Sequence, residues 1–170
     1  MFMLGLAAAS SVAAPAAAHA MTTTSATTSA TKAPACGNSD LRASYRYGDS
    51  GAGHRDGWIV LTNVSGHTCR TGGFGGLSYV GHGDGTQVGA PADRSGPAYT
   101  LLVRPGQRIR AAVDEVNALN YPRSTCRPVK VDGFRVYVPN ATRSQYVVHP
   151  TTGCANAKVH LLDHRSYRHP

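Results

Sequence analysis

The chain has 170 residues, enough for one folded domain once the N-terminal segment is set aside, and 17 Lys and Arg against 9 Asp and Glu give a net charge of +8. Its four cysteines are far apart, which excludes the close-pair motifs of structural zinc sites. The single glutamate, Glu115, follows Asp114, and because adjacent strand residues point to opposite faces, these two cannot form a glycosidase-type acid/base pair.

Residues 1–20 have the composition of a secretory signal. Leu4 to Ala18 is apolar and uncharged, and Ala18-His19-Ala20 fits the small-x-small cleavage pattern, although no Lys or Arg precedes the apolar run. A transmembrane helix is the alternative, but the run is rich in alanine and short of the roughly 20 residues needed to span a bilayer. The sequence favours export, followed by a disordered Thr/Ser/Ala-rich linker over residues 21–35.

Beyond the linker, short apolar or alternating runs are separated by Gly- and Pro-rich turns, a pattern typical of antiparallel strands. The clearest alternation is in residues 107–115, where Ile109, Ala111 and Val113 share one face. We expect strands at residues 41–47, 58–62, 77–80, 86–88, 100–103, 107–115, 131–138 and 145–148, a last strand marked by Val159 and Leu161, and a loop over residues 117–127.

This pattern predicts an all-β fold, an antiparallel immunoglobulin-like β-sandwich over residues 36–163, with a polar tail over residues 164–170. A small β-barrel is the alternative. An even number of cysteines in an exported domain indicates two disulfides. Of the three pairings that four cysteines allow, we favour Cys36–Cys69 and Cys126–Cys154, because each closes a local loop.

The basic residues are concentrated in the second part of the chain, with 11 basic against 4 acidic residues from Arg104 onward. Arg108 and Arg110 project from the same face of the alternating strand. Together with Arg104, Arg135 and Tyr137, which could lie nearby, they form a candidate anion-binding patch in which guanidinium groups bind the anion and the tyrosine stacks on a sugar or base. A solvated face is the alternative, since arginine outnumbers lysine 14 to 3, as GC-rich codons would give.

The histidines offer a weaker candidate. His160 and His164, with His169 nearby, suggest a metal site, but in a strand a spacing of four separates the rings by about 13 Å, too far for one ion. His82 and Asp84 lie in a glycine-rich hairpin tip, and no Gly-x-Ser-x-Gly elbow is present. We therefore expect no catalytic residues, no metal and no cofactor; a secreted hydrolase or metal-binding protein using loop His and Asp residues is the alternative.

Several motifs of this chain occur together with a distinctive spacing: Cys36, Asp40-Leu41, the stretch 61–69 ending in Cys69, Arg104-Pro105-Gly106, Cys126, Val138-Pro139 and Cys154. Together they resemble the actinobacterial secreted family called domain of unknown function 4232, over nearly all of residues 36–162. The turn Gly73-Phe74-Gly75-Gly76 departs from the Gly-Tyr-Pro-Gly that is usual in the family. The resemblance implies an exported β-sandwich near the cell envelope and brings no activity or catalytic residues.

These observations predict a secreted, non-catalytic, monomeric domain associated with the cell envelope. Its expected partner is an anionic cell-wall polymer or another envelope protein. Nucleic acid is not expected as a partner, because the protein is exported and has no recognisable reader motif. No stable membrane span is expected after cleavage of the signal.

Overall fold

The computed structural model describes residues 33–170. The expected signal and residues 21–32 of the expected linker lie outside the described residues. The described part consists of β1 (Leu41–Gly51), β2 (His54–Asn63), β3 (Cys69–Gly72), β4 (Gly76–Gly81), β5 (Thr86–Val88), β6 (Asp93–Ser95), β7 (Thr100–Val103), β8 (Arg108–Val116), η1 (Ala118–Asn120), α1 (Arg123–Cys126), β9 (Pro128–Tyr137), β10 (Ser144–Cys154) and β11 (Leu162–Arg165).

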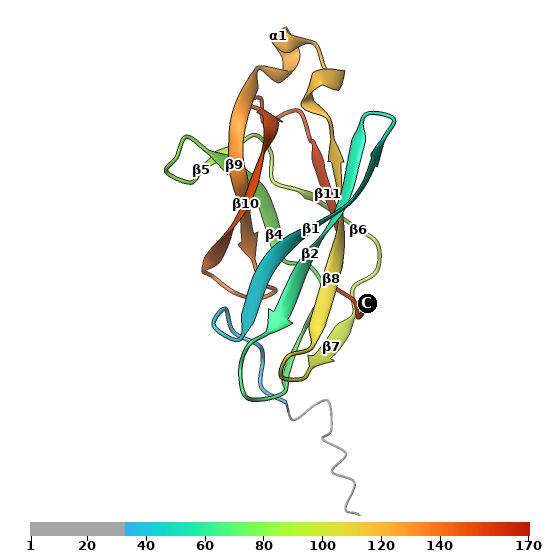
Figure 1. Cartoon of the computed structure of the whole chain (residues 1–170), viewed down its shortest axis with the longest axis vertical. Helices are drawn as coiled ribbons and strands as arrows, with labels where there is room; N and C mark the ends of the chain where they lie inside the picture. The colour runs from blue at the N-terminus through green and yellow to red at the C-terminus, as the bar shows by residue number, and fades with distance from the viewer. Residues whose placement is uncertain (1–32) are drawn as a thin grey trace, which may run out of the picture.

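Two sheets face each other in a sandwich (Figure 1). One has the strand order β1-β2-β8-β11-β6 and the other β10-β9-β4-β5, while β3 and β7 form a separate two-stranded ribbon. All neighbouring strands are antiparallel except β6 and β11, which are parallel. The prediction of an all-β, immunoglobulin-like antiparallel sandwich with two disulfides is confirmed.

The core lies between the two sheets and follows the alternation of the sequence. Ile109, Ala111 and Val113 of β8 and Phe134 and Val136 of β9 point inward, and each is at most 2% exposed. Because complete burial of such a side chain contributes about 1.5–3 kcal/mol, these inward residues fix the register of both strands.

The strands differ from expectation near Pro150. The short edge strand expected at residues 145–148 continues to Cys154, because a bulge between Val148 and Thr151 accommodates Pro150 without ending the strand. The expected loop over residues 117–127 contains η1 and α1, and the last strand begins at Leu162, after Val159 and Leu161.

The C-terminal segment is packed against the domain, whereas the sequence analysis expected a polar tail over residues 164–170. His164, Ser166 and Tyr167 are buried, and Tyr167 donates its backbone N–H to Gly73 at 2.9 Å. Arg168 exchanges two backbone hydrogen bonds with Arg110 at 2.8 and 2.9 Å. The aromatic ring of Tyr167 explains the difference, since its burial outweighs the polarity of its neighbours.

At the other end, the folded part includes the last residues of the expected linker. Ala33 is buried, and Pro34 accepts a backbone hydrogen bond from Arg70 at 2.7 Å. The chain enters the domain beside the β3–β7 ribbon, at the end opposite to α1 (Figure 1). No helix within residues 33–170 is long and apolar enough to cross a membrane.

The disulfides join Cys36 to Cys69 and Cys126 to Cys154, across sequence separations of 33 and 28 residues. The first ties the chain entry to β3, and the second ties α1 to the end of β10. Both cysteine pairs are buried in the core.

Two edge strands, β1 and β10, lie side by side along one side of the sandwich. The side chain of Gln145 joins them: its Oε1 accepts the backbone N–H of Ala43 at 2.9 Å, and its Nε2 donates to the backbone carbonyl of Leu41 at 2.6 Å. Unpaired edge backbone is a template for aggregation, and this one amide occupies two backbone groups on the edge of β1.

Removing either disulfide should lower the free energy of unfolding by roughly 3.5–4 kcal/mol, as an upper estimate from the loop each one closes. The double variants Cys36→Ser/Cys69→Ser and Cys126→Ser/Cys154→Ser, measured by urea denaturation, test this. Peptide mapping without reduction should recover the same two pairs, and any other linked pair would contradict the structure.

Gln145→Leu should lower the free energy of unfolding by about 1–2 kcal/mol, because the N–H of Ala43 and the carbonyl of Leu41 lose their partner. It should also increase aggregation of the folded protein, measured by light scattering at temperatures below unfolding. Gln87→Leu is the matched control, since Gln87 is exposed and makes one hydrogen bond within its own loop. Equal effects in the two variants would show that Gln145 has no special role.

Candidate functional site

The five residues of the expected anion-binding patch do not lie together. Arg108 and Arg110 are on the outer face of β8, and Arg104 lies in the turn before that strand. Arg135 and Tyr137 are on the outer face of β9, in the other sheet, where the guanidinium of Arg135 donates to the backbone carbonyl of Gly85. Because the inner faces of β8 and β9 both point into the core, their outer faces lie on opposite sides of the sandwich.

Arg108 and Arg110 instead meet residues from β1 and β2. The register pairs Thr62 with Arg108, Val60 with Arg110, and Trp58 with Arg46. A groove of about 350 Å³ runs between these side chains. We call it the arginine groove; it is lined by Arg46, Tyr47, Trp58, Val60, Arg108, Arg110 and Pro170.

Trp58 lies between arginines from both sides of its strand. The guanidinium carbon of Arg110 is 5.4 Å from the centre of the Trp58 ring, within the range of a cation–π contact. The Nε of Arg110 is buried and has no hydrogen-bond partner among residues 33–170. The groove therefore presents an indole and three guanidinium groups.

The sequence indicated which face each of these arginines occupies but not which strands are neighbours. Arg46 alternates with the inward residues of β1, so its outward position was predictable. That Trp58 would lie between Arg46 and Arg110 depends on the pairing of β2 with β1 and β8, which the sequence alone does not specify.

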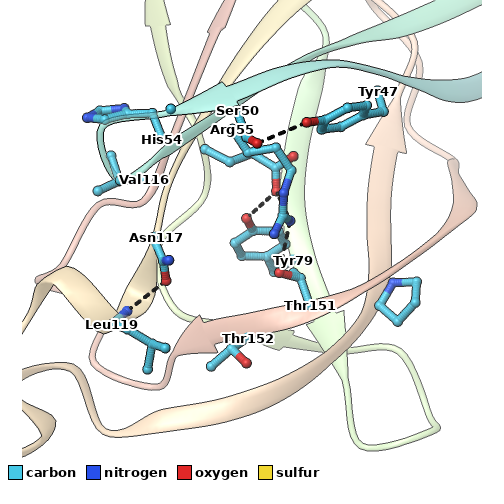
Figure 2. Close-up of a pocket in the computed structure, with 14 residues that line it drawn as sticks. Tyr47, Ser50, His54, Arg55, Tyr79, Val116, Asn117, Leu119, Thr151 and Thr152 are labelled. Atoms are coloured by element: carbon cyan, nitrogen blue, oxygen red, sulfur yellow. Dashed lines mark hydrogen bonds and ion pairs between the residues drawn. The ribbon is translucent and has the colours of Figure 1, made fainter.

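A second hollow, with a volume of about 630 Å³, lies between the β1–β2 hairpin, η1 and the middle of β10 (Figure 2). We call it the hairpin cleft. It opens where both edge strands are irregular: β1 bulges between Tyr47 and Asp49, and β10 between Val148 and Thr151. The bulges separate the two edges that Gln145 joins nearer the chain entry.

The floor of the hairpin cleft contains the buried carboxylate of Glu115, which is 2% exposed. Tyr45 donates its hydroxyl to Oε1 at 2.8 Å, and Tyr79 donates its hydroxyl to Oε2 at 2.6 Å. The Nε2 of His149 lies 2.8 Å from Oε2, and the Nη1 of Arg55 lies 3.8 Å from the same oxygen. We call these five residues the Glu115 network.

These contacts determine the ionisation of the network. Burial alone would raise the pKa of Glu115, but the hydrogen bonds from His149, Tyr79 and Tyr45 favour the carboxylate more strongly and lower the pKa below its ordinary value of 4.5. Burial and the negative charge of Glu115 together raise the pKa of both tyrosine hydroxyls. Glu115 is therefore an anion at neutral pH, with neutral tyrosines as its donors.

Aromatic packing holds the donors in place. The ring of His149 is stacked on Phe134, with 4.4 Å between ring centres and an interplanar angle of 9°. The ring centre of Tyr45 lies 4.5 Å from that of His149. The ring of Tyr45 passes directly over Gly57, where any side chain would collide with the phenol. Gly57 therefore allows Tyr45 to reach Glu115.

The sequence analysis did not identify this network, although one signal was present. Glu115 continues the inward alternation of Ile109, Ala111 and Val113, so a charge was predictable on the core face of β8. The structure also separates it from Asp114, whose carboxylate lies on the outer face and is 2.8 Å from the Nδ1 of His54.

The histidines considered for a metal site are dispersed. The Nδ1 of His160 lies 3.0 Å from both carboxylate oxygens of Asp93, His164 packs edge-on against Phe74 at 5.8 Å, and the Nδ1 of His169 is 3.3 Å from the Nε2 of Gln107. No group of His, Cys, Asp and Glu side chains within residues 33–170 has an arrangement that could hold a metal ion.

Glu115→Gln should lower the free energy of unfolding at pH 7 by about 1–3 kcal/mol, because three donors lose a shared carboxylate. The folded-state pKa of Glu115 is lowered, so its stabilising contribution is complete above pH 4.5 and is lost as the pH falls through the folded-state value. The stability difference between the native protein and the variant should therefore shrink below pH 4.5.

Urea denaturation at a series of pH values measures this difference. Asp49→Asn, which removes one exposed carboxylate, is the control and should give no comparable convergence. A difference between native protein and Glu115→Gln that stays constant down to acid pH would contradict the assigned ionisation.

The comparisons with known proteins show a family and no individual relative. No curated protein and no solved structure matches the chain. A family model described as a domain of unknown function (DUF4232) matches residues 36–163, a span that includes both disulfides, the Glu115 network and every arginine of the arginine groove. The chain therefore belongs to the DUF4232 family.

Proposed function

We propose that the protein is an exported, non-catalytic binding module of the cell envelope, and that it holds an anionic polymer in the arginine groove. The observation that carries the proposal is the arrangement of Arg46, Arg108 and Arg110 around Trp58. Guanidinium groups bind phosphate and carboxylate through paired hydrogen bonds, and an indole face packs against the flat face of a sugar ring. An anionic glycan offers both features.

The composition supports an anionic partner. The net charge of +8 attracts polyanions over a longer range than any single contact does. Among the described residues, no Asp or Glu side chain forms an ion pair with Arg46, Arg108 or Arg110. Their charge remains available for a ligand.

Two features support export. Disulfides persist in oxidising compartments, and both cysteine pairs of this chain are bonded. The apolar segment at the N-terminus and the Thr/Ser/Ala-rich stretch after it have the composition of a signal and a tether. We infer that, once the signal is removed, the domain stays near the envelope through what the groove binds.

An envelope protein with an acidic surface is the second candidate partner, because the same guanidinium groups would bind Asp and Glu side chains. The hydrolase alternative has less support. The Glu115 network has one carboxylate with both oxygens occupied, and among the described residues no hydrogen bond joins His149 to the hydroxyl of Thr151, which accepts from Arg55.

The mature protein should be retained by purified, nuclease-treated cell-wall fractions, and retention should fade as salt is added, because the contacts are ionic. Arg108→Ala/Arg110→Ala should weaken retention by about tenfold or more at low salt, since loss of 1.4 kcal/mol is already a factor of ten. A pull-down over a salt series, using fractions of the producing cell, measures both effects.

Arg123→Ala/Arg143→Ala is the matched control, since it removes two exposed arginines outside the groove. Equal loss in the two double variants would mean that net charge, not the groove, drives binding. Absence of retention at every salt concentration would remove the polymer proposal and direct the search to an envelope protein.

A further inference from the structure

Arg55 places a cation at the floor of the hairpin cleft. Its Nη1 donates to the hydroxyl of Thr151 at 3.1 Å and lies 3.8 Å from the Oε2 of Glu115. Its Nε and Nη2 have no hydrogen-bond partner within residues 33–170, and the side chain is 39% exposed. Figure 2 shows the guanidinium extending into the middle of the cleft beside Tyr79 and Thr151.

Glu115 explains why Arg55 is held there. The carboxylate already has three hydrogen-bond partners, so at 3.8 Å it attracts the guanidinium without using up its donors. Arg55 is thus oriented by a buried charge while several N–H groups still face the cleft. A planar anion such as a carboxylate is the partner that such a set of donors fits best.

The walls of the hairpin cleft are lined by neutral hydrogen-bonding groups. They come from Ser50 of the hairpin, Asn117 before η1, and Thr151 and Thr152 of β10. The Oδ1 of Asn117 accepts the backbone N–H of Leu119, which leaves its Nδ2 as a donor. Hydroxyl and amide groups on several sides suit a ligand that itself has many hydroxyl groups.

The mouth of the cleft is apolar. Tyr47 and Leu119 are large side chains that are 57% and 67% exposed, and they lie on different walls (Figure 2). The volume of about 630 Å³ is within the usual range for small-molecule sites. An exposed tyrosine ring at the rim of a hydroxyl-lined cleft is well placed to pack against a sugar face.

From this geometry we infer that the hairpin cleft is a second binding site, specific for a sugar that carries a carboxylate. The carboxylate pairs with Arg55, the hydroxyl groups bind the walls, and the ring packs against Tyr47. Tyr47 also lines the arginine groove, so one acidic glycan could pass from the groove over the edge of β1 into the cleft. Only this last connection rests on the proposed function; the cleft site itself does not.

Titration of the ¹⁵N-labelled mature protein with sodium glucuronate, followed by NMR, tests the inference. Amide signals of Ser50, Asn117, Thr151 and Thr152 should shift together. Glucuronate should bind roughly 10- to 100-fold more tightly than glucose, the range expected for a hydrogen-bonded ion pair. Acetate should also bind more weakly than glucuronate, because it cannot use the walls.

Arg55→Lys keeps the charge next to Glu115 and should remain folded, yet it should weaken glucuronate binding about tenfold because the paired geometry is lost. Tyr47→Ala, at the exposed rim, should weaken binding without changing stability. Arg108→Ala/Arg110→Ala should leave the glucuronate-induced shifts of the four cleft amides unchanged, which separates this site from the arginine groove.

Four results would overturn the inference. Glucose binding as tightly as glucuronate would remove the role of Arg55, and acetate binding as tightly would remove the role of the walls. Absence of shifts at the four cleft amides would remove the cleft site. Loss of those cleft shifts in Arg108→Ala/Arg110→Ala would assign the sugar to the groove.

Discussion

The buried carboxylate of Glu115 is the interaction on which the rest of the structure depends. An ionised carboxylate in a protein interior costs several kcal/mol unless hydrogen bonds and opposite charge compensate for its lost hydration. Here β1, β4 and β10 provide the donors, while Glu115 itself is on β8. The charge is compensated only when strands of both sheets are in their correct positions. The network therefore disfavours incorrect strand registers, and this effect matters more than its net contribution to stability.

The same requirement explains why the sandwich is open at one end. Tyr45 must cross Gly57 to reach the carboxylate, and His149 reaches it from the irregular part of β10. Beyond this level the two edge strands separate, and the space between them is the hairpin cleft. The cleft is therefore a consequence of how hydrogen-bond donors reach the buried carboxylate. Arg55 both compensates the charge of Glu115 and faces the solvent in the cleft.

The sequence predicted the fold well because its signals are local. Alternation identified β8 and β9, and the Pro-Gly and Gly-rich turns separated the strands. The sequence did not predict which strands are neighbours or which sheet each strand belongs to. Arg135 and Tyr137 alternate as clearly as Arg108 and Arg110, and nothing local reveals that β8 and β9 belong to different sheets. Glu115 is the instructive case, since its inward position was readable but its three donors lie 34 to 70 residues away along the chain.

The first disulfide has a mechanical consequence. The chain enters the domain beside the β3–β7 ribbon, at the end opposite to α1 and the tip of the β1–β2 hairpin (Figure 1), and Cys36 is covalently joined to Cys69 at the start of β3. A force on the chain before Cys36, acting against a ligand held at the far end, would therefore divide between β1 and β3. Without the disulfide, β1 and the backbone hydrogen bonds that join Pro34 and Cys36 to Arg70 would carry that force. We expect the disulfide to raise the force at which β1 detaches from the edge of its sheet.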